Sequence, residues 1–126
     1  MNKMNSIQFG EGNFIRAFVD YCIQLLNEKT EFNGKVSVIQ PIEKGKIEIL
    51  KNQKGQFHLF IEGIFNNKNI RDIKVISCID KVINPYKEFE SFLELAKDKN
   101  LNFVFSNTTE AGIEYNKNDL KSMKPP

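Results

Sequence analysis

The chain has 126 residues, of which 40% are hydrophobic and 27% charged, and its formal net charge is +2. This length fits one domain with a buried core and an ordinary polar surface. Its lysines are spread along the chain and alternate with acids, as in residues 43–48, whereas nucleic-acid binders concentrate basic residues in a stripe. We therefore expect a solvated surface at residues 43–48 and no nucleic-acid partner.

Membrane, secretory and metal-binding classes are also disfavoured. No apolar run approaches the roughly 18 residues that a bilayer-spanning helix needs, and the first residues do not resemble a signal peptide. Cys22 and Cys78 lie far apart and lack metal-ligand spacing, which predicts two buried free thiols and no metal site. Together these features indicate a cytoplasmic protein without a membrane partner. The sequence leaves the oligomeric state open.

The first third of the chain reads as strand, helix and strand. Residues 7–9 form a short apolar run typical of a buried parallel strand. Residues 14–29 then place apolar side chains at spacings of three and four, on one face of a helix. That face comprises Phe14, Phe18, Tyr21, Cys22, Leu25 and Leu26. After a stop or turn at residues 33–34, residues 35–40 predict a second strand that Pro41 ends. This order makes a βαβ unit with a right-handed crossover.

The rest of the chain adds a hairpin, a helix and a further strand. Residues 56–64 and residues 70–83 read as strands around a turn at residues 66–69, which predicts an inserted β-hairpin. A helix is predicted from about Pro85 to residue 99, and a buried strand over residues 101–105. The tail is polar and ends in two prolines, which indicates a domain boundary or a truncation. The fold class is therefore α/β: a Rossmann-like nucleotide-binding domain with an inserted β-hairpin.

The strongest local signal is a pair of glycines between the first strand and the helix. Gly10 allows a sharp turn, and Gly12 allows a pyrophosphate to approach the main chain, next to the free N–H groups of a helix start. Asn13 is a good capping residue and is expected at that start. The spacing departs from the usual fingerprint, because Ile15 stands where a third small residue is expected and Ala17 follows two residues later.

Several side chains near this turn are candidate cofactor ligands. Arg16 lies in the first helical turn, where a cation opposes the helix dipole, so it either binds pyrophosphate or pairs with Asp20. Gln40 stands where many NAD-binding proteins place an acid that holds the adenosine ribose, and it could bind that ribose. Lys44 and Lys46 could reach a 2′-phosphate, so these residues leave NAD and NADP both open.

A polar cluster follows the last predicted strand. Asn107, Thr108, Thr109 and Glu110 come where ligands of open α/β sheets collect, so they are candidates to contact a nicotinamide ribose or a substrate. Helix capping is the alternative role for these residues. His58, the single histidine, lies mid-strand without partners for catalysis or metal binding, and we expect it to be structural.

Three blocks of sequence, in the same order, resemble a known family. Residues 7–20, residues 26–30 with residues 40–42, and residues 103–113 are similar to the mannitol dehydrogenase family of polyol-specific long-chain dehydrogenases, in particular to its tagaturonate-reducing members. The resemblance implies metal-free, reversible reduction of tagaturonate to altronate with NADH. Fructuronate, mannitol or a polyol phosphate are alternative substrates. A non-catalytic α/β binding module is the alternative of another class.

The resemblance also implies roles for individual residues. Gly10, Gly12, Phe14 and Arg16 match the family's cofactor loop. Residues 107–110 match its second cofactor-side loop, in which Glu110 would be an ancillary group that tunes proton transfer. The family's catalytic lysine lies in a helical C-terminal domain that has no counterpart in residues 1–126. We therefore expect this chain to bind a nicotinamide dinucleotide and to reduce no sugar by itself.

Overall fold

The computed structural model describes residues 3–108, 115, 117 and 118, and it confirms the predicted α/β fold class. A parallel sheet has the strand order β5-β2-β1-β6, and a separate antiparallel hairpin joins β3 to β4. The strands of the main sheet are β1 (Lys3–Phe9), β2 (Asn33–Ile39), β5 (Ile79–Ile83) and β6 (Leu101–Ser106). The carboxyl ends of these four strands therefore lie along one edge of the sheet.

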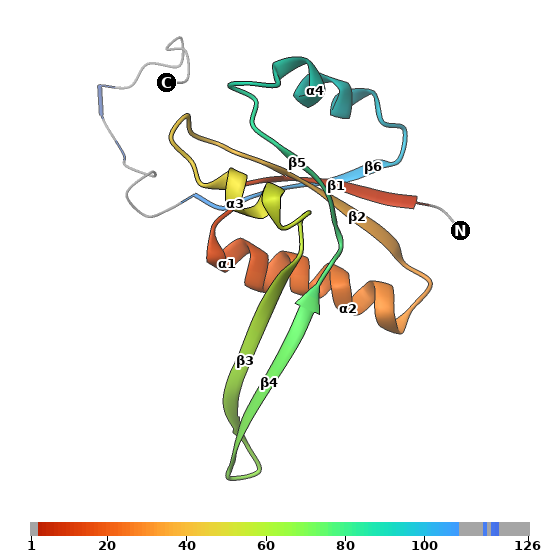
Figure 1. The fold of residues 1–126 in the computed structure, drawn as a ribbon, viewed down its shortest axis with the longest axis vertical. Coiled ribbons are helices and arrows are strands. Elements are labelled where there is room, and N and C mark those ends of the chain that lie inside the picture. The colour runs from red at the N-terminus through yellow and green to blue at the C-terminus, as the bar shows by residue number, and fades with distance from the viewer. Residues whose placement is uncertain (1–2, 109–114, 116, 119–126) are drawn as a thin grey trace.

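The core lies on both faces of the central strands, as parallel sheets require. Val36 and Val38 of β2 are fully buried on one face, where Ile23 of α2 packs against them. Ile39 packs on the opposite face against Leu95, because successive side chains of a strand point to opposite sides. Figure 1 shows the corresponding layers, with α2 on one side of the sheet, α4 on the other and the hairpin projecting away.

One continuous helical segment connects β1 to β2. It consists of α1 (Asn13–Ile15), a π-helical turn η1 (Arg16–Asp20) and α2 (Tyr21–Lys29). The predicted helix is confirmed, but its predicted apolar face is not the buried one, since Phe14 and Phe18 are 68% and 62% exposed. The buried side chains are Ile15, Asp20 and Ile23. A π turn holds more residues than an α turn, so a strict 3.6-residue period fails across it.

The two cysteines have different surroundings. Cys78 is buried, as predicted, whereas the prediction that Cys22 is buried is wrong. Cys22 follows Phe18 by four residues and lies on the same exposed face of the helical segment. Both thiols are free.

The predicted turn at residues 33–34 is wrong, because Asn33 and Gly34 open β2. The side chain of Asn27 donates to the Gly34 carbonyl at 2.8 Å and accepts from the Gly34 N–H at 2.7 Å. A Cβ on Gly34 would come within 2.4 Å of the Phe32 ring. Close packing, rather than a turn, explains this glycine.

The predicted hairpin is confirmed as β3 (Phe57–Phe65) paired with β4 (Lys68–Ile76). Its turn is shorter than predicted, because Asn66 and Asn67 both take the positive φ values of a two-residue hairpin turn, 49° and 58°. His58 lies exposed on β3.

The predicted single strand over residues 70–83 is wrong in its second part. The chain leaves the hairpin at Ile76, and β5 then pairs in parallel with β2 in the main sheet. Two contacts with the helical segment redirect it: the Ser77 N–H donates to the Gln24 side chain at 3.0 Å, and the Cys78 thiol donates to the Asp20 carbonyl at 3.4 Å. Alternation of apolar and polar residues cannot show that the chain passes from one sheet to another.

One helix was not predicted. The segment α3 (Ile47–Asn52) overlaps residues 43–48, for which we expected only a solvated surface. Ile47 and Leu50 are almost fully buried in it. Six residues are too few for a helical period to stand out among the surrounding charges.

The last two elements differ in detail from the prediction. The helix α4 (Phe89–Glu94), followed by a 3₁₀ turn η2 (Leu95–Lys97), begins four residues after Pro85. The intervening turn is held by the Asn84 carbonyl, which accepts the N–H groups of Lys87 and Glu88. The prediction that β6 is buried is wrong, since Val104 is 61% exposed. Among the described strands β6 pairs with β1 alone, so its other edge is open.

Within the described ranges, no helix is long and apolar enough to cross a membrane. The same residues contain no group of three or more His, Cys, Asp or Glu side chains placed to hold a metal ion.

Candidate functional site

The candidate site lies where the strand order reverses. From β1 the chain moves outward through β2 and β5, and then returns to place β6 on the opposite side of β1. Phe9, the last residue of β1, is level with Ile39 of β2 on one side and Ser106 of β6 on the other. Open α/β sheets bind ligands in the crevice outside the carboxyl ends of their strands at such a switch point.

Three connections at this edge form the site. We call residues 10–16 the first loop, residues 40–46 the second loop and residues 84–88 the third loop. They follow β1, β2 and β5 respectively. The Gly10 N–H donates to the Ile39 carbonyl at 2.9 Å, and the Gln40 N–H donates to the Ile83 carbonyl at 3.1 Å. The starts of all three loops are therefore linked by backbone hydrogen bonds.

Gly10 and Gly12 serve the first loop in different ways. Gly10 has a φ of 123°, which L side chains rarely adopt, so it forms the sharp turn expected from the sequence. Gly12 has an ordinary φ of −66°. A Cβ built on Gly12 would meet nothing within 4 Å, so its backbone faces open space.

The helical segment begins directly after Gly12. Asn13 lies at the helix start, as expected, but it is the first helical residue, and the N-cap position is held by Gly12 without a side-chain capping bond. The first bond of the helix runs from the Arg16 N–H to the Gly12 carbonyl at 3.3 Å. The preceding N–H groups have no partner within the helix, which is the usual condition of a helix start.

Arg16 folds back over the first loop. Its Nε donates to the Glu11 carbonyl at 2.9 Å, and its Nη2 donates to the Asn13 side chain at 2.8 Å. Its guanidinium carbon lies 4.9 Å from the centre of the Phe57 ring. Among the ion pairs of the described residues none joins Arg16 to Asp20, so the alternative role predicted for Arg16 is not observed.

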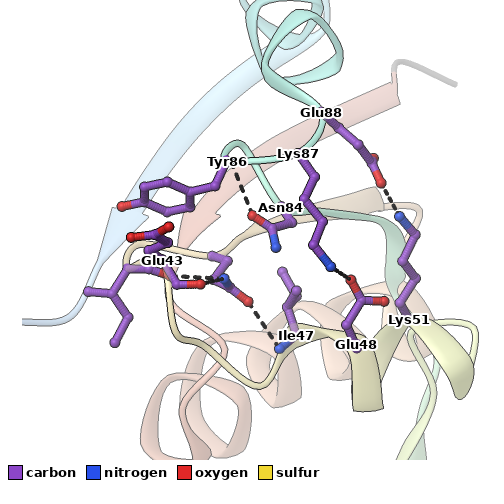
Figure 2. Close-up of polar contacts among 10 residues, drawn as sticks. Glu43, Ile47, Glu48, Lys51, Asn84, Tyr86, Lys87 and Glu88 are labelled. Carbon is purple, nitrogen blue, oxygen red and sulfur yellow. Dashed lines mark hydrogen bonds and ion pairs between the residues drawn. The ribbon is translucent and has the colours of Figure 1, made fainter.

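The second loop is closed by the side chain of Gln40, which is 1% exposed. Its Nε2 donates to the carbonyls of Ile42 and Glu43 at 2.8 and 3.1 Å, and its Oε1 accepts the Ile47 N–H at 3.3 Å (Figure 2). A Cβ on Gly45 would come within 2.4 Å of this side chain. The amide of Gln40 is thus engaged in its own loop, and its predicted bond to a ribose remains a prediction.

A cavity of about 490 Å³ opens between the first loop, the second loop and α3. The Glu11 carboxylate spans it, since Oε1 accepts the Lys46 N–H at 3.1 Å. Three cations also line it. The lining residues are Glu11, Gly12, Asn13, Arg16, Ile42, Lys44, Gly45, Lys46, Ile49, Leu50 and Gln53. The cavity is therefore wide enough for part of a dinucleotide and carries more positive than negative side chains.

The third loop also contacts α3 and the second loop, which form one wall of the cavity (Figure 2). Lys51 pairs with Glu88, and Lys87 pairs with Glu48 at 3.3 Å. The Tyr86 hydroxyl donates to the Pro41 carbonyl at 3.1 Å. Exposed ion pairs of this kind stabilise weakly one by one, but these two join α3 to the third loop.

The end of β6 supplies the remaining predicted residues. Asn107 and Thr108 are exposed and follow Ser106, which is level with Phe9 of β1. They follow the carboxyl end of a strand, as predicted, and that end lies next to the switch point. Phe14 is exposed at the start of the helical segment and stacks against Phe18, with ring centres 6.1 Å apart. Glu110, the predicted ancillary residue, and Thr109 lie outside the described residues.

Gln8 and Asp20 form a buried polar pair beneath the first loop that we did not predict. Gln8 Nε2 donates to the Gly10 carbonyl at 3.1 Å and to Asp20 Oδ2 at 3.5 Å. Burial raises the pKa of the Asp20 carboxyl to about 7, against the smaller lowering effects of Gln8 and Arg16. A glutamine in the middle of a short apolar strand was the available signal for this pair.

Comparisons with known proteins agree with this geometry. A family model described as the mannitol dehydrogenase Rossmann domain matches residues 4–125. An altronate oxidoreductase of Phocaeicola vulgatus is 46% identical over 109 residues, which cover 86% of this chain and 23% of that protein. One from Bacillus subtilis is 40% identical over 119 residues, covering 94% and 25%. The chain thus spans about a quarter of the length of these relatives.

Two solved structures share the fold. A mannitol 2-dehydrogenase of Pseudomonas fluorescens, solved with NAD and D-mannitol, has a TM-score of 0.69 at 16% identity and covers 84% of this chain and 22% of that one. A D-sorbitol dehydrogenase in substrate-free form has a TM-score of 0.69 at 18% identity, covering 93% and 26%.

Proposed function

Because the chain belongs to the family described as the mannitol dehydrogenase Rossmann domain, we propose that it is the NAD-binding part of an altronate oxidoreductase. The observation that carries this proposal is the first loop, where the open backbone at Gly12 and the unpaired N–H groups of a helix start border the cavity. The altronate oxidoreductases at 40% to 46% identity support the substrate class.

The first loop fits a pyrophosphate in shape and charge. A Cβ built on Gly12 would meet no protein atom within 4 Å, so the space beside this residue is available to phosphate oxygens. The N–H groups and positive dipole end of the helix favour an anion there. Arg16 has five N–H donors in all, and its hydrogen bonds to Glu11 and Asn13 leave others to face a phosphate.

The adenosine half of the dinucleotide would lie in the cavity between the first and second loops. Glu11 offers a carboxylate to the ribose hydroxyls, whereas the amide of Gln40 is engaged in the second loop in this structure. Lys44 and Lys46 also line the cavity, so a 2′-phosphate remains compatible with it. We propose NAD as the cofactor on the strength of the family and the carboxylate.

The nicotinamide half would extend past Gly10 toward Asn107 and Thr108 at the end of β6. When bound, NADH supplies a hydride to the keto carbon of tagaturonate, giving altronate. We assign Asn107 and Thr108 to orienting the nicotinamide ribose or the substrate, with Glu110 as an ancillary group. The proton for the new hydroxyl would come from a general acid, a lysine in the family, outside residues 1–126. This chain positions the cofactor, which carries the redox chemistry.

Two assays test the proposal. Adding NADH should raise the melting temperature of the 126-residue chain, because a ligand that binds only the native state stabilises it. The same chain should oxidise no NADH with tagaturonate, whereas the full-length protein should do so. Faster turnover by the full-length protein with fructuronate, mannitol or a polyol phosphate would replace the proposed substrate. An unchanged melting temperature would favour a non-catalytic binding module.

A further inference from the structure

The buried pair beneath the first loop has two polar atoms without partners. Gln8 and Asp20 are both fully buried, and Gln8 Oε1 and Asp20 Oδ1 make no hydrogen bond. Buried polar atoms are rarely left unpaired, because each such atom has lost its hydrogen bonds to water without replacement. Asp20 also ends the π-helical turn η1, a distortion that is common at functional sites.

A proton on Asp20 would satisfy both atoms at once. An ionised carboxylate only accepts hydrogen bonds, whereas a protonated one also donates. A carboxylic acid and a primary amide can join through two bonds, with amide N–H to one carboxyl oxygen and acid O–H to the amide oxygen. The first of these bonds is present, from Gln8 Nε2 to Asp20 Oδ2. The two unpaired atoms are the ones that the second bond needs.

We propose that Asp20 is a positioning residue, protonated in the nucleotide-binding form, whose pairing with Gln8 holds the Gly10 carbonyl and so fixes the first loop for the pyrophosphate. The link is Gln8 Nε2, which donates to both the Gly10 carbonyl and Asp20. The part of this inference that concerns the pyrophosphate rests on the proposed function.

Among the described groups that face Asp20, only Arg16 carries a charge that acts on its carboxyl. From its own helical segment, Arg16 acts on the carboxyl and favours its ionised form. From the segment after β4, the Cys78 thiol donates to the Asp20 carbonyl, and burial raises the pKa of this thiol to about 12, so it stays neutral. Lys35 of β2 acts on Cys78 only weakly. Burial outweighs Arg16, and the pKa of Asp20 is raised to about 7.

Ionisation of Asp20 would weaken nucleotide binding for two reasons. It removes the second bond of the pair, and it places a negative charge beneath the loop that takes the pyrophosphate. Nucleotide affinity should therefore fall as the pH rises through about 7. One proton is coupled to binding, so the fall is at most about tenfold per pH unit.

The test measures NADH affinity of the full-length protein by calorimetry from about pH 5.5 to about pH 8.5. Asp20→Asn keeps a neutral group that can make both bonds to Gln8, so it should match wild-type affinity at low pH and stay level above pH 7. Asp80→Asn is the control for the substitution itself, since it makes the same Asp-to-Asn change at an exposed site. It should retain the wild-type pH profile.

A second readout follows the proton without nucleotide. Infrared difference spectra should show the carbonyl band of a buried protonated carboxyl that disappears above pH 7 in wild type and is missing in Asp20→Asn. Absence of this band at low pH, or equal pH profiles for wild type and Asp20→Asn, would overturn the inference. A titrating band together with no NADH binding at any pH would overturn the proposed function and leave the protonated pair standing.

Discussion

The first and second loops face each other across one cavity, but they are held in opposite ways. The first loop takes its shape from a glycine turn and a buried pair below it, and its N–H groups and Gly12 stay open. The second loop is closed by the amide of Gln40, which occupies two of its carbonyls. The first loop therefore suits main-chain binding of an anion, while the second offers side chains such as Lys44 and Lys46.

The largest effect is expected from Gly12→Val. The new side chain would occupy the proposed pyrophosphate position, so NADH affinity should fall at least about a thousandfold, or about 4 kcal/mol. Because a Cβ at Gly12 meets no protein atom, the free energy of unfolding should change by less than about 0.5 kcal/mol. Calorimetry and urea unfolding measure the two quantities.

Gly63→Val is the control for that substitution. Gly63 lies on β3 of the hairpin, and a Cβ there also meets nothing within 4 Å. This variant should bind NADH like wild type. An equal loss of affinity in both variants would show that a non-specific effect, rather than the first loop, is responsible.

The pH dependence of stability should distinguish the first loop, which lies above the titrating Asp20, from the second loop, which Gln40 holds. Asp20 has a pKa raised from 3.8 to about 7, so the native state binds more protons than the unfolded state between these values. Stability should therefore fall as the pH rises from about 4 to about 7, by on the order of 3 kcal/mol. Asp20→Asn should remove this slope in urea unfolding measured across the range. The same slope in both proteins would assign it to other groups.

Gln40→Ala should open the second loop. It removes the acceptor of the buried Ile47 N–H and two bonds to loop carbonyls, so the protein should lose about 2 kcal/mol of stability at every pH. Urea unfolding of Gln56→Ala, an exposed residue outside the loop, supplies the control. A loss below about 0.5 kcal/mol would mean that the loop keeps its shape without the amide.

The smallest effect concerns the lysines of the second loop. Replacing Lys44 and Lys46 by alanine should weaken NADPH binding about fivefold and NADH binding about twofold, because solvent-exposed charges act weakly. The double variant of Lys68 and Lys99, which are exposed elsewhere, controls for the change in net charge. Equal weakening of both cofactors would place the 2′-phosphate away from these lysines.

The sequence predicted well what short-range patterns encode. Strands β1, β2 and β6, the long helical segment, the hairpin and the glycine turn at Gly10 were expected from period, composition and spacing, and the structure has them, whereas β5 was not separated from the hairpin. The placement of Asn107 and Thr108 just past the end of a strand was also expected. This placement follows from where strands end in a parallel sheet.

What the sequence missed depends on contacts between distant segments. The π turn ends at Asp20, whose carbonyl accepts from Cys78, and the chain leaves the hairpin where Ser77 donates to Gln24, so both features involve partners far along the chain. The same holds for Gln8 with Asp20, which are twelve positions apart. The sequence also did not show that the Gln40 amide hydrogen-bonds within its own loop, and its bond to a ribose stays a prediction.

The most direct measurement is a crystal structure of the full-length protein with NADH bound. Our account predicts pyrophosphate oxygens within hydrogen-bond distance of the N–H groups that follow Gly12, with the adenosine ribose near Glu11. A dinucleotide bound elsewhere, with Gly12 facing solvent, would contradict it.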